Sequence, residues 1–174
     1  MLRGLGSLYL SQMITLLPSA LCVSITDKAA RTVKKAEEME FPLKLNEIVR
    51  VLVKRPATNR TKKDKEKANE ILLVSNIKFD VEKYVKFDVF VNDKDKVPTA
   101  TPADSEFAGS FAQIPYGGTD KRMMMTSGVR FGLNELLEDI KAEDDEYILV
   151  TLVPRSGCDD VTVSEIKIDL VPIV

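Results

Sequence analysis

The 174-residue sequence contains no histidine, and this absence limits its function more than any motif does. Histidine is the usual general acid or base near neutral pH and the commonest metal ligand in proteins. Without it, the chain forms neither a Ser-His-Asp triad nor a Cys-His pair, and it offers no imidazole to zinc, copper or iron. The enzymes whose sites depend on these groups are therefore excluded.

Other residue types are scarce as well. Trp is absent and aromatic residues make up 6% of the chain, so platforms for base stacking are not expected. The formal net charge of −2 gives no overall attraction to nucleic acid or to an anionic membrane. The cysteines, Cys22 and Cys158, are too few for a four-thiolate zinc site, and we expect two free thiols rather than a disulfide.

Residues 1–26 differ from the rest of the chain, because they contain a single charged residue. Their apolar run, Leu8–Val23, is interrupted by polar residues and is too short and too polar for a membrane span. A basic start, an apolar middle and small residues near the end fit a secretory signal peptide over residues 1–22. The alternatives are an unstructured or unrelated leader and a buried amphipathic helix.

A charged linker over residues 27–42 is predicted to join this leader to a domain over residues 43–174. The linker consists of helix-forming residues of mixed charge with few apolar positions, which favours a solvated helix or an extended tether. Its proline ends any helix at the preceding residue. Lys34 and Lys35 are candidate protease-sensitive positions within it.

From residue 43 onward, short stretches with apolar residues at every second position indicate strands. The predicted strands lie at residues 43–56, 71–80, 85–93, 105–115, 121–133, 146–153 and 160–174. The apolar run over 146–153 predicts a central strand, and a short helix is expected near 134–141 with Asn134 as its cap. The fold class is therefore all-β: an antiparallel, jelly-roll-like β-sandwich of about seven strands, with an irregular N-terminal extension.

The strand over residues 85–93 alternates apolar and polar residues, so it is expected to be half-buried with Phe87 and Val89 inward. Asp88 lies on the polar phase of this strand, and exposure to solvent is the preferred interpretation. Pairing with a lysine of a neighbouring strand and a place on a docking face are the alternatives.

Two further strands carry predictions about the direction of their side chains. Three alternating residues of the strand over 105–115 are expected to share one face: Phe107, Gly109 and Phe111. In the last strand the apolar residues change from odd to even positions, ending with Ile168 and Leu170. A bulge near Ser164 is therefore expected to keep both sets inward.

Several polar or sulfur-rich stretches have simple structural explanations that we prefer. The lysines of residues 62–67 are interleaved with acids, so a solvated loop is favoured over a polyanion site. The acidic residues 143–146 lack the spacing of a calcium loop and indicate a connection. Met123–Met125 are expected to pack within a strand, because consecutive strand residues point to opposite faces and do not converge on a soft metal.

Three segments carry a resemblance to a known family: KFDVFVND at 86–93, SEFAGSF at 105–111 and LVTLVPRSG at 149–157. With the flanking pieces VLVKRP, GVRFGLNELLED and EDDEYILVTLVPR, their order and spacing resemble the C-terminal domain of plant polyphenol oxidases, the tyrosinase-like catechol oxidases. The resemblance runs from about Lys34 to the end of the chain. The matching motif residues, which we expect to be structural, are Lys86, Phe87, Asp88, Val89, Phe107, Ala108, Gly109, Ser110 and Phe111.

This resemblance implies an activity for the family but not for this chain alone. Full-length members oxidise o-diphenols to o-quinones with dioxygen at two copper ions, each held by three histidines. None of these ligands can be mapped onto a chain without histidine. We therefore expect no catalytic residue, metal site or cofactor in this chain, and we note Tyr116 where the family leads us to expect histidine.

The resemblance also implies a partner and a location. In the family, this domain covers the copper site and keeps the enzyme latent until proteolysis, acid or detergent releases it. The expected partner is the catalytic domain of a polyphenol oxidase, in cis or in trans, and neither nucleic acid nor a membrane span is expected. The family acts in the plastid, in the thylakoid lumen, although residues 1–26 are too short and too apolar for a transit peptide.

The alternative function is a secreted β-sandwich binding module. It rests on the signal-like residues 1–22 and on the sequence Asn59-Arg60-Thr61, which is a potential glycosylation site if the chain is exported. Chance occurrence of this tripeptide is the preferred interpretation.

Overall fold

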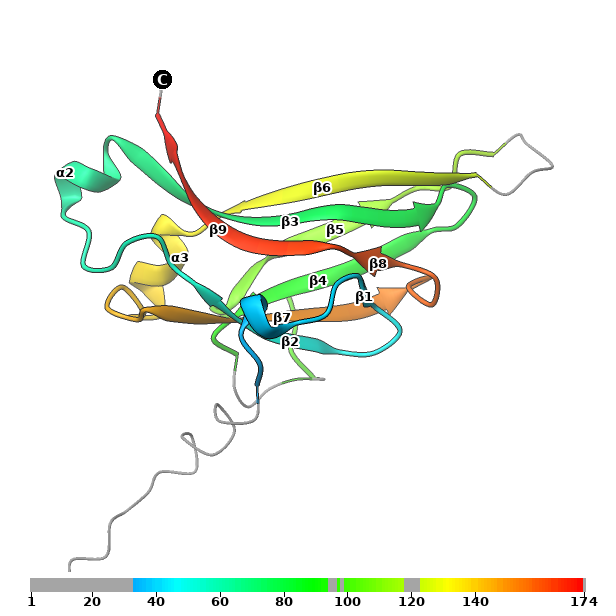
Figure 1. The fold of residues 1–174 in the computed structure, drawn as a ribbon, viewed down its shortest axis with the longest axis horizontal. Coiled ribbons are helices and arrows are strands. Elements are labelled where there is room, and N and C mark those ends of the chain that lie inside the picture. The colour runs from blue at the N-terminus through cyan, green and yellow to red at the C-terminus, as the bar shows by residue number, and fades with distance from the viewer. Residues whose placement is uncertain (1–32, 94–96, 98, 118–122, 174) are drawn as a thin grey trace, which may run out of the picture.

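The computed structural model describes residues 33–93, 97, 99–117 and 123–173. Two antiparallel sheets lie face to face in this part of the chain (Figure 1). The first sheet has the order β2-β7-β4-β5, with the bounds β2 Val49–Lys54, β7 Tyr147–Ser156, β4 Val85–Val91 and β5 Phe107–Gln113. The predicted all-β sandwich is confirmed, and β7 is central as expected.

The second sheet is built around the long strand β3, Ala68–Asp80. β6, Met124–Gly132, pairs with one side of β3, and β9 and β8 follow one another along its other side. The remaining bounds are β1 Leu43–Lys44, β8 Thr162–Val163 and β9 Glu165–Pro172. The two sheets are not hydrogen-bonded to each other among the described residues. β2 lies against β9 along one side of the sandwich, and β5 lies against β6 along the other.

The described residues form nine strands, two more than the pattern predicts, because two predicted strands are interrupted. The stretch between β1 and β2 connects the second sheet to the first, and Ser164 separates β8 from β9. This interruption absorbs the change of phase, so that Val163 and Ile168 both face the core. Leu170 was expected inward but is 38% exposed, because the C-terminal end of β9 rises away from the opposite sheet (Figure 1).

Among the described residues, helical structure is limited to three short segments: η1 Ala36–Glu38, α2 Lys62–Lys65 and α3 Asn134–Asp139. α3 lies where the sequence predicts a helix, but its N-cap is Leu133 rather than Asn134. The side chain of Asn134 is used elsewhere, since its Oδ1 accepts a hydrogen bond of 3.0 Å from the backbone N–H of Glu70. None of these helices is long and apolar enough to cross a membrane.

The lysine-rich stretch is more ordered than a loop. Thr61 caps α2, and its hydroxyl and backbone N–H both contact the carboxylate of Asp64. Lys65 forms ion pairs with Glu138 and Glu143, which tie α2 to α3 and to the acidic connection that follows it. The positive charges are therefore partly neutralised. The solvated loop predicted for residues 62–67 is instead a short capped helix over Lys62–Lys65.

The core between the sheets contains a group of three phenylalanines from different strands. The ring of Phe87 stacks on that of Phe111 with centroids 5.2 Å apart, and Phe79 contacts Phe111 at 5.6 Å. Their burial, with that of the surrounding aliphatic side chains, supplies most of the hydrophobic stabilisation of the sandwich.

The expectation that the strand over 85–93 is half-buried was wrong. β4 lies between β7 and β5, and almost all of its residues are buried on both faces. The outer face is covered by a second hydrophobic cluster, in which Val97, Ala100 and Phe107 pack against Phe90 and Val153. Val97 and Ala100, which lie between β4 and β5 in the sequence, thus cover part of the outer face of this sheet.

The prediction that Phe107, Gly109 and Phe111 share one face was also wrong. Val89 pairs with Gly109 and Phe90 pairs with Phe107, so that Ala108 is an extra residue in β5. This β-bulge turns Phe107 to the outer face, where its ring lies 5.5 Å from that of Phe90. Phe111 remains in the core.

Candidate functional site

No metal-binding cluster is evident in the part of the chain that the structure describes. It contains no group of three or more His, Cys, Asp or Glu side chains arranged to hold a metal ion. Cys158 is a free, buried thiol whose Sγ lies 3.1 Å from the carbonyl oxygen of Lys86. Burial raises the pKa of this thiol, which disfavours the nucleophilic thiolate. Cys22 and the leader at residues 1–26 lie outside the described residues.

The charged residue of the central motif, Asp88, lies in a polar site on the outer face of the first sheet. Its carboxylate is only 2% exposed, so the expected exposure to solvent was wrong. Oδ2 accepts a hydrogen bond of 2.7 Å from Nε of Arg155, and Oδ1 accepts one of 2.5 Å from the hydroxyl of Ser110. Arg155 also donates to the carbonyl of Ala100. Asp88 of β4 is therefore linked directly to β5 and β7, and through Arg155 to Ala100.

A second buried ion pair, which the sequence analysis missed, closes one end of the sandwich. Arg55 donates to both carboxylate oxygens of Glu70, through Nε at 2.6 Å and Nη2 at 2.9 Å. Its Nη1 donates to three backbone carbonyls of the acidic connection after α3, those of Ala142, Glu143 and Asp145. The available signal for this ion pair in the sequence was Arg55 itself, a charged residue directly before Pro56 at the end of an apolar strand.

The candidate protease-sensitive residues belong to a segment that is attached to the domain, which we call the strap (residues 34–41). The backbone N–H of Leu52 donates to the carbonyl of Lys34 at 3.0 Å, and Lys35 forms a parallel bridge with Leu52. Nζ of Lys35 lies 4.4 Å from the ring centroid of Tyr147 and 3.3 Å from its hydroxyl. The hydrogen bond with Tyr147 raises the pKa of Lys35.

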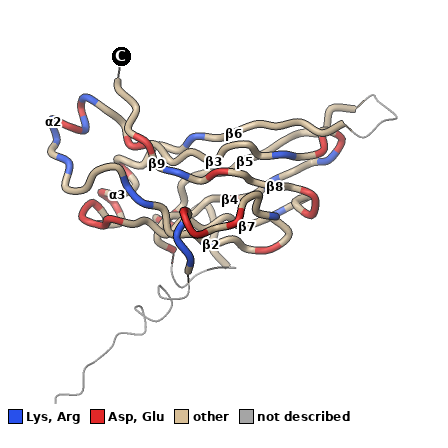
Figure 2. The backbone as a smooth tube through the Cα atoms, viewed as in Figure 1, with Lys and Arg blue, Asp and Glu red and all other residues tan. Residues whose placement is uncertain are grey.

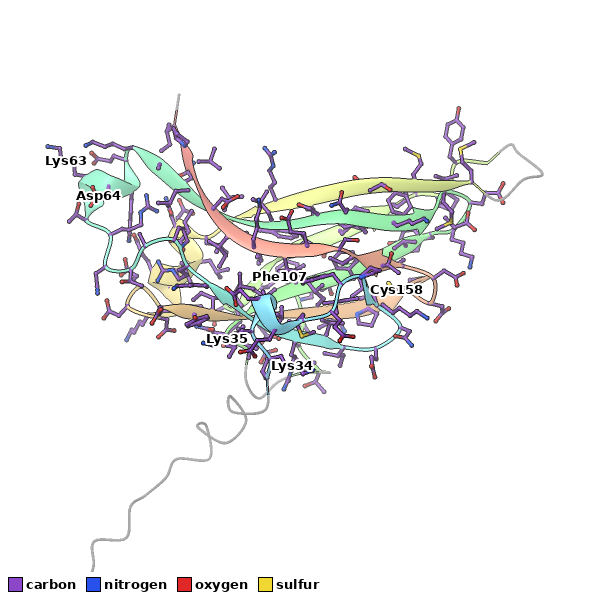
Figure 3. All side chains as sticks on the ribbon, in the orientation of Figure 1. Lys34, Lys35, Lys63, Asp64, Phe107 and Cys158 are labelled. Atoms are coloured by element: carbon purple, nitrogen blue, oxygen red, sulfur yellow. The ribbon has the colours of Figure 1, made fainter. Side chains whose placement is uncertain are left out.

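The strap also contributes apolar contacts, since Ala36, Met39 and Phe41 pack against the core. Figure 3 shows Lys34 and Lys35 beside η1, on the side of the ribbon away from β6. The N-terminal end of the strap is therefore attached to the domain at β2. Whether Lys34 and Lys35 are cleaved stays a prediction.

A cluster of exposed apolar side chains lies at the opposite side of the sandwich, and we call it the methionine tip. Its members come from the turn before β4, from the end of β5 and from the start of β6: Tyr84, Ile114, Tyr116, Met123, Met124 and Met125. Strand packing was expected for the three methionines, but all three are exposed. Within the described residues, β6 pairs only with β3, so its outer edge is open.

Comparison with known proteins identifies the family. Residues 41–170 match the family described as the chloroplastic polyphenol oxidase C-terminal domain. The chain belongs to this family.

Curated relatives and solved structures agree with this assignment. The chain is 49% identical over 132 residues to a chloroplastic polyphenol oxidase of Vitis vinifera, covering 76% of this chain and 21% of that protein. It is 47% identical over 131 residues to a chloroplastic polyphenol oxidase of Malus domestica, and that match covers 75% of this chain and 21% of that protein. A solved latent aurone synthase is 59% identical, with a TM-score of 0.75, and the match covers 82% of this chain and 28% of that one. The chain thus spans about a fifth to a quarter of the length of its relatives.

The copper chemistry of polyphenol oxidases does not fit the donor set of this domain. Each copper of the family is held by imidazole groups, and the chain has none. Tyr116, which stands where the family led us to expect histidine, is 76% exposed. No step of diphenol oxidation is therefore assigned to these residues.

The motif residues of this polyphenol oxidase domain divide between two environments. Phe87, Val89 and Phe111 lie in the core between the sheets. Asp88 and Phe107 lie on the outer face, together with the segment that joins β4 to β5. The motif residues therefore contribute contacts on both faces of the first sheet.

Proposed function

We propose that this chain is the non-catalytic shielding domain of a polyphenol oxidase, which docks on the catalytic domain and keeps it latent. The observation that carries the proposal is the match to the last part of a latent aurone synthase, with 59% identity and a TM-score of 0.75. A latent apple tyrosinase matches in the same way, with 43% identity and a TM-score of 0.70.

A shielding domain needs a rigid body, because a loosely folded cover would let substrate pass. The sandwich meets this requirement through a core that joins both sheets, through the buried ion pair Arg55–Glu70 and through the partly exposed pair Asp88–Arg155. Hydrogen-bonded pairs of this kind fix the relative positions of the strands that carry them.

A shielding domain also needs a tether that enters at a defined place. The strap provides one, since Lys34 and Lys35 are fixed to the edge of β2. Chain that precedes the strap is a suitable target for the proteolysis that releases the domain in this family. The partner is then the catalytic domain in cis, and the same surface would serve in trans.

The proposed location is the plastid, and within it the thylakoid lumen. Relatives from Vitis vinifera, Malus domestica and Ipomoea batatas are named chloroplastic polyphenol oxidases. Fractionation of plant cells with an antibody against this domain tests the location.

A chimeric oxidase tests the shielding function. Residues 33–174 of this chain replace the corresponding C-terminal segment of the latent aurone synthase, and oxidation of a simple o-diphenol is measured before and after limited proteolysis. We expect low activity that rises when the domain is removed. A correctly folded chimera that is fully active before proteolysis would overturn the proposal.

The isolated chain provides the second measurement. It is incubated with copper, dioxygen and the same o-diphenol, and quinone formation is followed. We expect no turnover above that of free copper, because the chain has no imidazole ligand. Saturable turnover by the chain would contradict its non-catalytic role.

A further inference from the structure

We propose that the methionine tip is the surface through which this domain docks on the catalytic domain of its polyphenol oxidase. This inference rests on the shielding function proposed above and adds the part of the surface that makes the contact.

The tip gathers most of the exposed large apolar side chains of the described residues into three neighbouring segments. Ten large hydrophobic side chains are exposed among the described residues, and the six tip residues are the majority of them. Backbone hydrogen bonds hold three tip segments together, from Tyr116 N–H to the carbonyl of Val81 and from Val81 N–H to the carbonyl of Met123. Contiguous apolar patches on a soluble domain mark interaction sites.

Two of the six tip residues, Met124 and Met125, lie in β6, an edge strand whose outer backbone is not hydrogen-bonded to another strand among the described residues. β6 carries no charged residue from Met124 to Val129, and Figure 2 shows an uninterrupted tan tube along this half of the strand. Exposed edge strands without charges are prone to unwanted pairing, so proteins usually cover them. Methionine side chains suit such a cover, because their flexible thioethers adapt to the opposing surface.

The arrangement of the fold favours the catalytic domain as the partner that covers the tip. The matching segment is 28% of the latent aurone synthase chain, so most of that protein is a body tethered to this domain. A tethered partner has an effective concentration of about millimolar, far above that of a second copy in solution. The strap reaches the sandwich at β2, on the side away from β5 and β6, and therefore leaves the tip free.

Paired variants in the chimeric oxidase test this assignment. Ile114→Ser/Tyr116→Ser and Met123→Gln/Met125→Gln remove apolar surface from the tip. Leu170→Ser/Ile173→Ser is the matched control, because these two side chains belong, with Val171, to another exposed apolar group at the C-terminal end. Ile114 and Tyr116 are 75% and 76% exposed, so we expect the melting temperature to be unchanged.

The measured quantity is the ratio of activity after proteolysis to activity before it. We expect each tip variant to lower this ratio about tenfold, because truncation of central interface residues weakens docking by that order. The control variant should keep the ratio of the unsubstituted chimera. Tip variants that remain fully latent would overturn the docking surface while leaving the shielding function intact. An unsubstituted chimera without latency would instead overturn the shielding function itself.

Two other outcomes would also overturn the assignment. If the control lowers latency as much as the tip variants do, the effect is general loss of apolar surface. If the isolated chain forms a dimer that the tip variants abolish, a second copy is the partner. A photo-cross-link supplies positive evidence: Tyr116→p-benzoylphenylalanine should attach to peptides of the catalytic domain, whereas the same replacement at Ile173 should not.

Discussion

Arg155 of β7 and Asp88 of β4 form a salt bridge of 2.7 Å across the first sheet, with the carboxylate shielded from water. The Arg155 side chain remains 29% exposed, so solvent screens part of the attraction. The carboxylate has the larger role, because it also accepts a hydrogen bond from the hydroxyl of Ser110.

Asp88→Ala should therefore lower the free energy of unfolding by about 2–3 kcal/mol, since it leaves a hydroxyl and a guanidinium without their partner. Urea denaturation followed by circular dichroism measures the change. Asp160→Asn is the matched control, because the exposed pair between Lys83 and Asp160 should contribute less than about 1 kcal/mol. Equal effects of the two substitutions would contradict the structural role of Asp88.

Gly109 is predicted to be irreplaceable within the bulge of β5. Its φ is +147°, and an added Cβ would lie 2.6 Å from Cε1 and 2.7 Å from Cδ1 of Phe131. We expect Gly109→Ala to destabilise the domain by about 2–4 kcal/mol through backbone strain and overpacking. Gly132→Ala, on β6, has nothing within 4 Å of the added atom and should change stability by less than about 1 kcal/mol. Thermal melting of both variants checks the difference.

Local periodicity was sufficient to predict the all-β class, the central β7, the position of α3 and the break at Ser164. It failed where residues distant in sequence decide the environment. Alternation in β4 suggested one polar face, but the chain between β4 and β5 covers that face and Arg155 compensates the charge of Asp88. The local sequence of β4 contains neither the covering residues nor Arg155, so its pattern alone does not predict the burial of Asp88.

The bulge at Ala108 illustrates a second limit. A single extra residue reverses the face of every residue before it, so Phe107 and Phe111 were predicted on one face although they lie on opposite faces. The exposure of the methionine tip was missed for a related reason. Met123–Met125 have the composition of core residues, yet all three are exposed, because no other described element buries this end of β6.

The strap is predicted to protect the bond after Lys34 from proteases. Trypsin requires an extended, unpaired substrate, whereas the carbonyl of Lys34 is hydrogen-bonded and Lys35 is held against Tyr147. Tyr147→Ala removes the ring that holds Lys35, and we expect cleavage after Lys34 to be about fivefold faster, in proportion to local opening. Mass spectrometry of early digestion products measures the rate. Glu146→Gln, at the neighbouring exposed position, should leave it unchanged, and a Tyr147→Ala rate equal to that of the control would contradict the protection.

Cys158 should react slowly with thiol reagents at mildly alkaline pH, because burial raises its pKa above the ordinary value of 9.0. A pKa that is higher in the folded state means that folding favours the protonated thiol. Its contribution to stability is then complete below the unfolded-state pKa and is lost as the pH rises through the folded-state pKa. Labelling by a disulfide reagent in a Cys22→Ser background, with and without urea, measures the protection. Equal rates in the two conditions would show that the thiol is accessible in the folded domain.

Thr151 offers a stabilising substitution. Its side chain is fully buried on the central strand β7, and its Oγ1 has no hydrogen-bond partner within the described residues. Valine has nearly the same shape without the polar atom, so Thr151→Val should raise the free energy of unfolding by about 1 kcal/mol. Thr126→Val, on exposed β6, should change it by less than about 0.5 kcal/mol. Chemical denaturation distinguishes the two, and a loss of stability in Thr151→Val would indicate that the hydroxyl has a bonded partner such as a buried water.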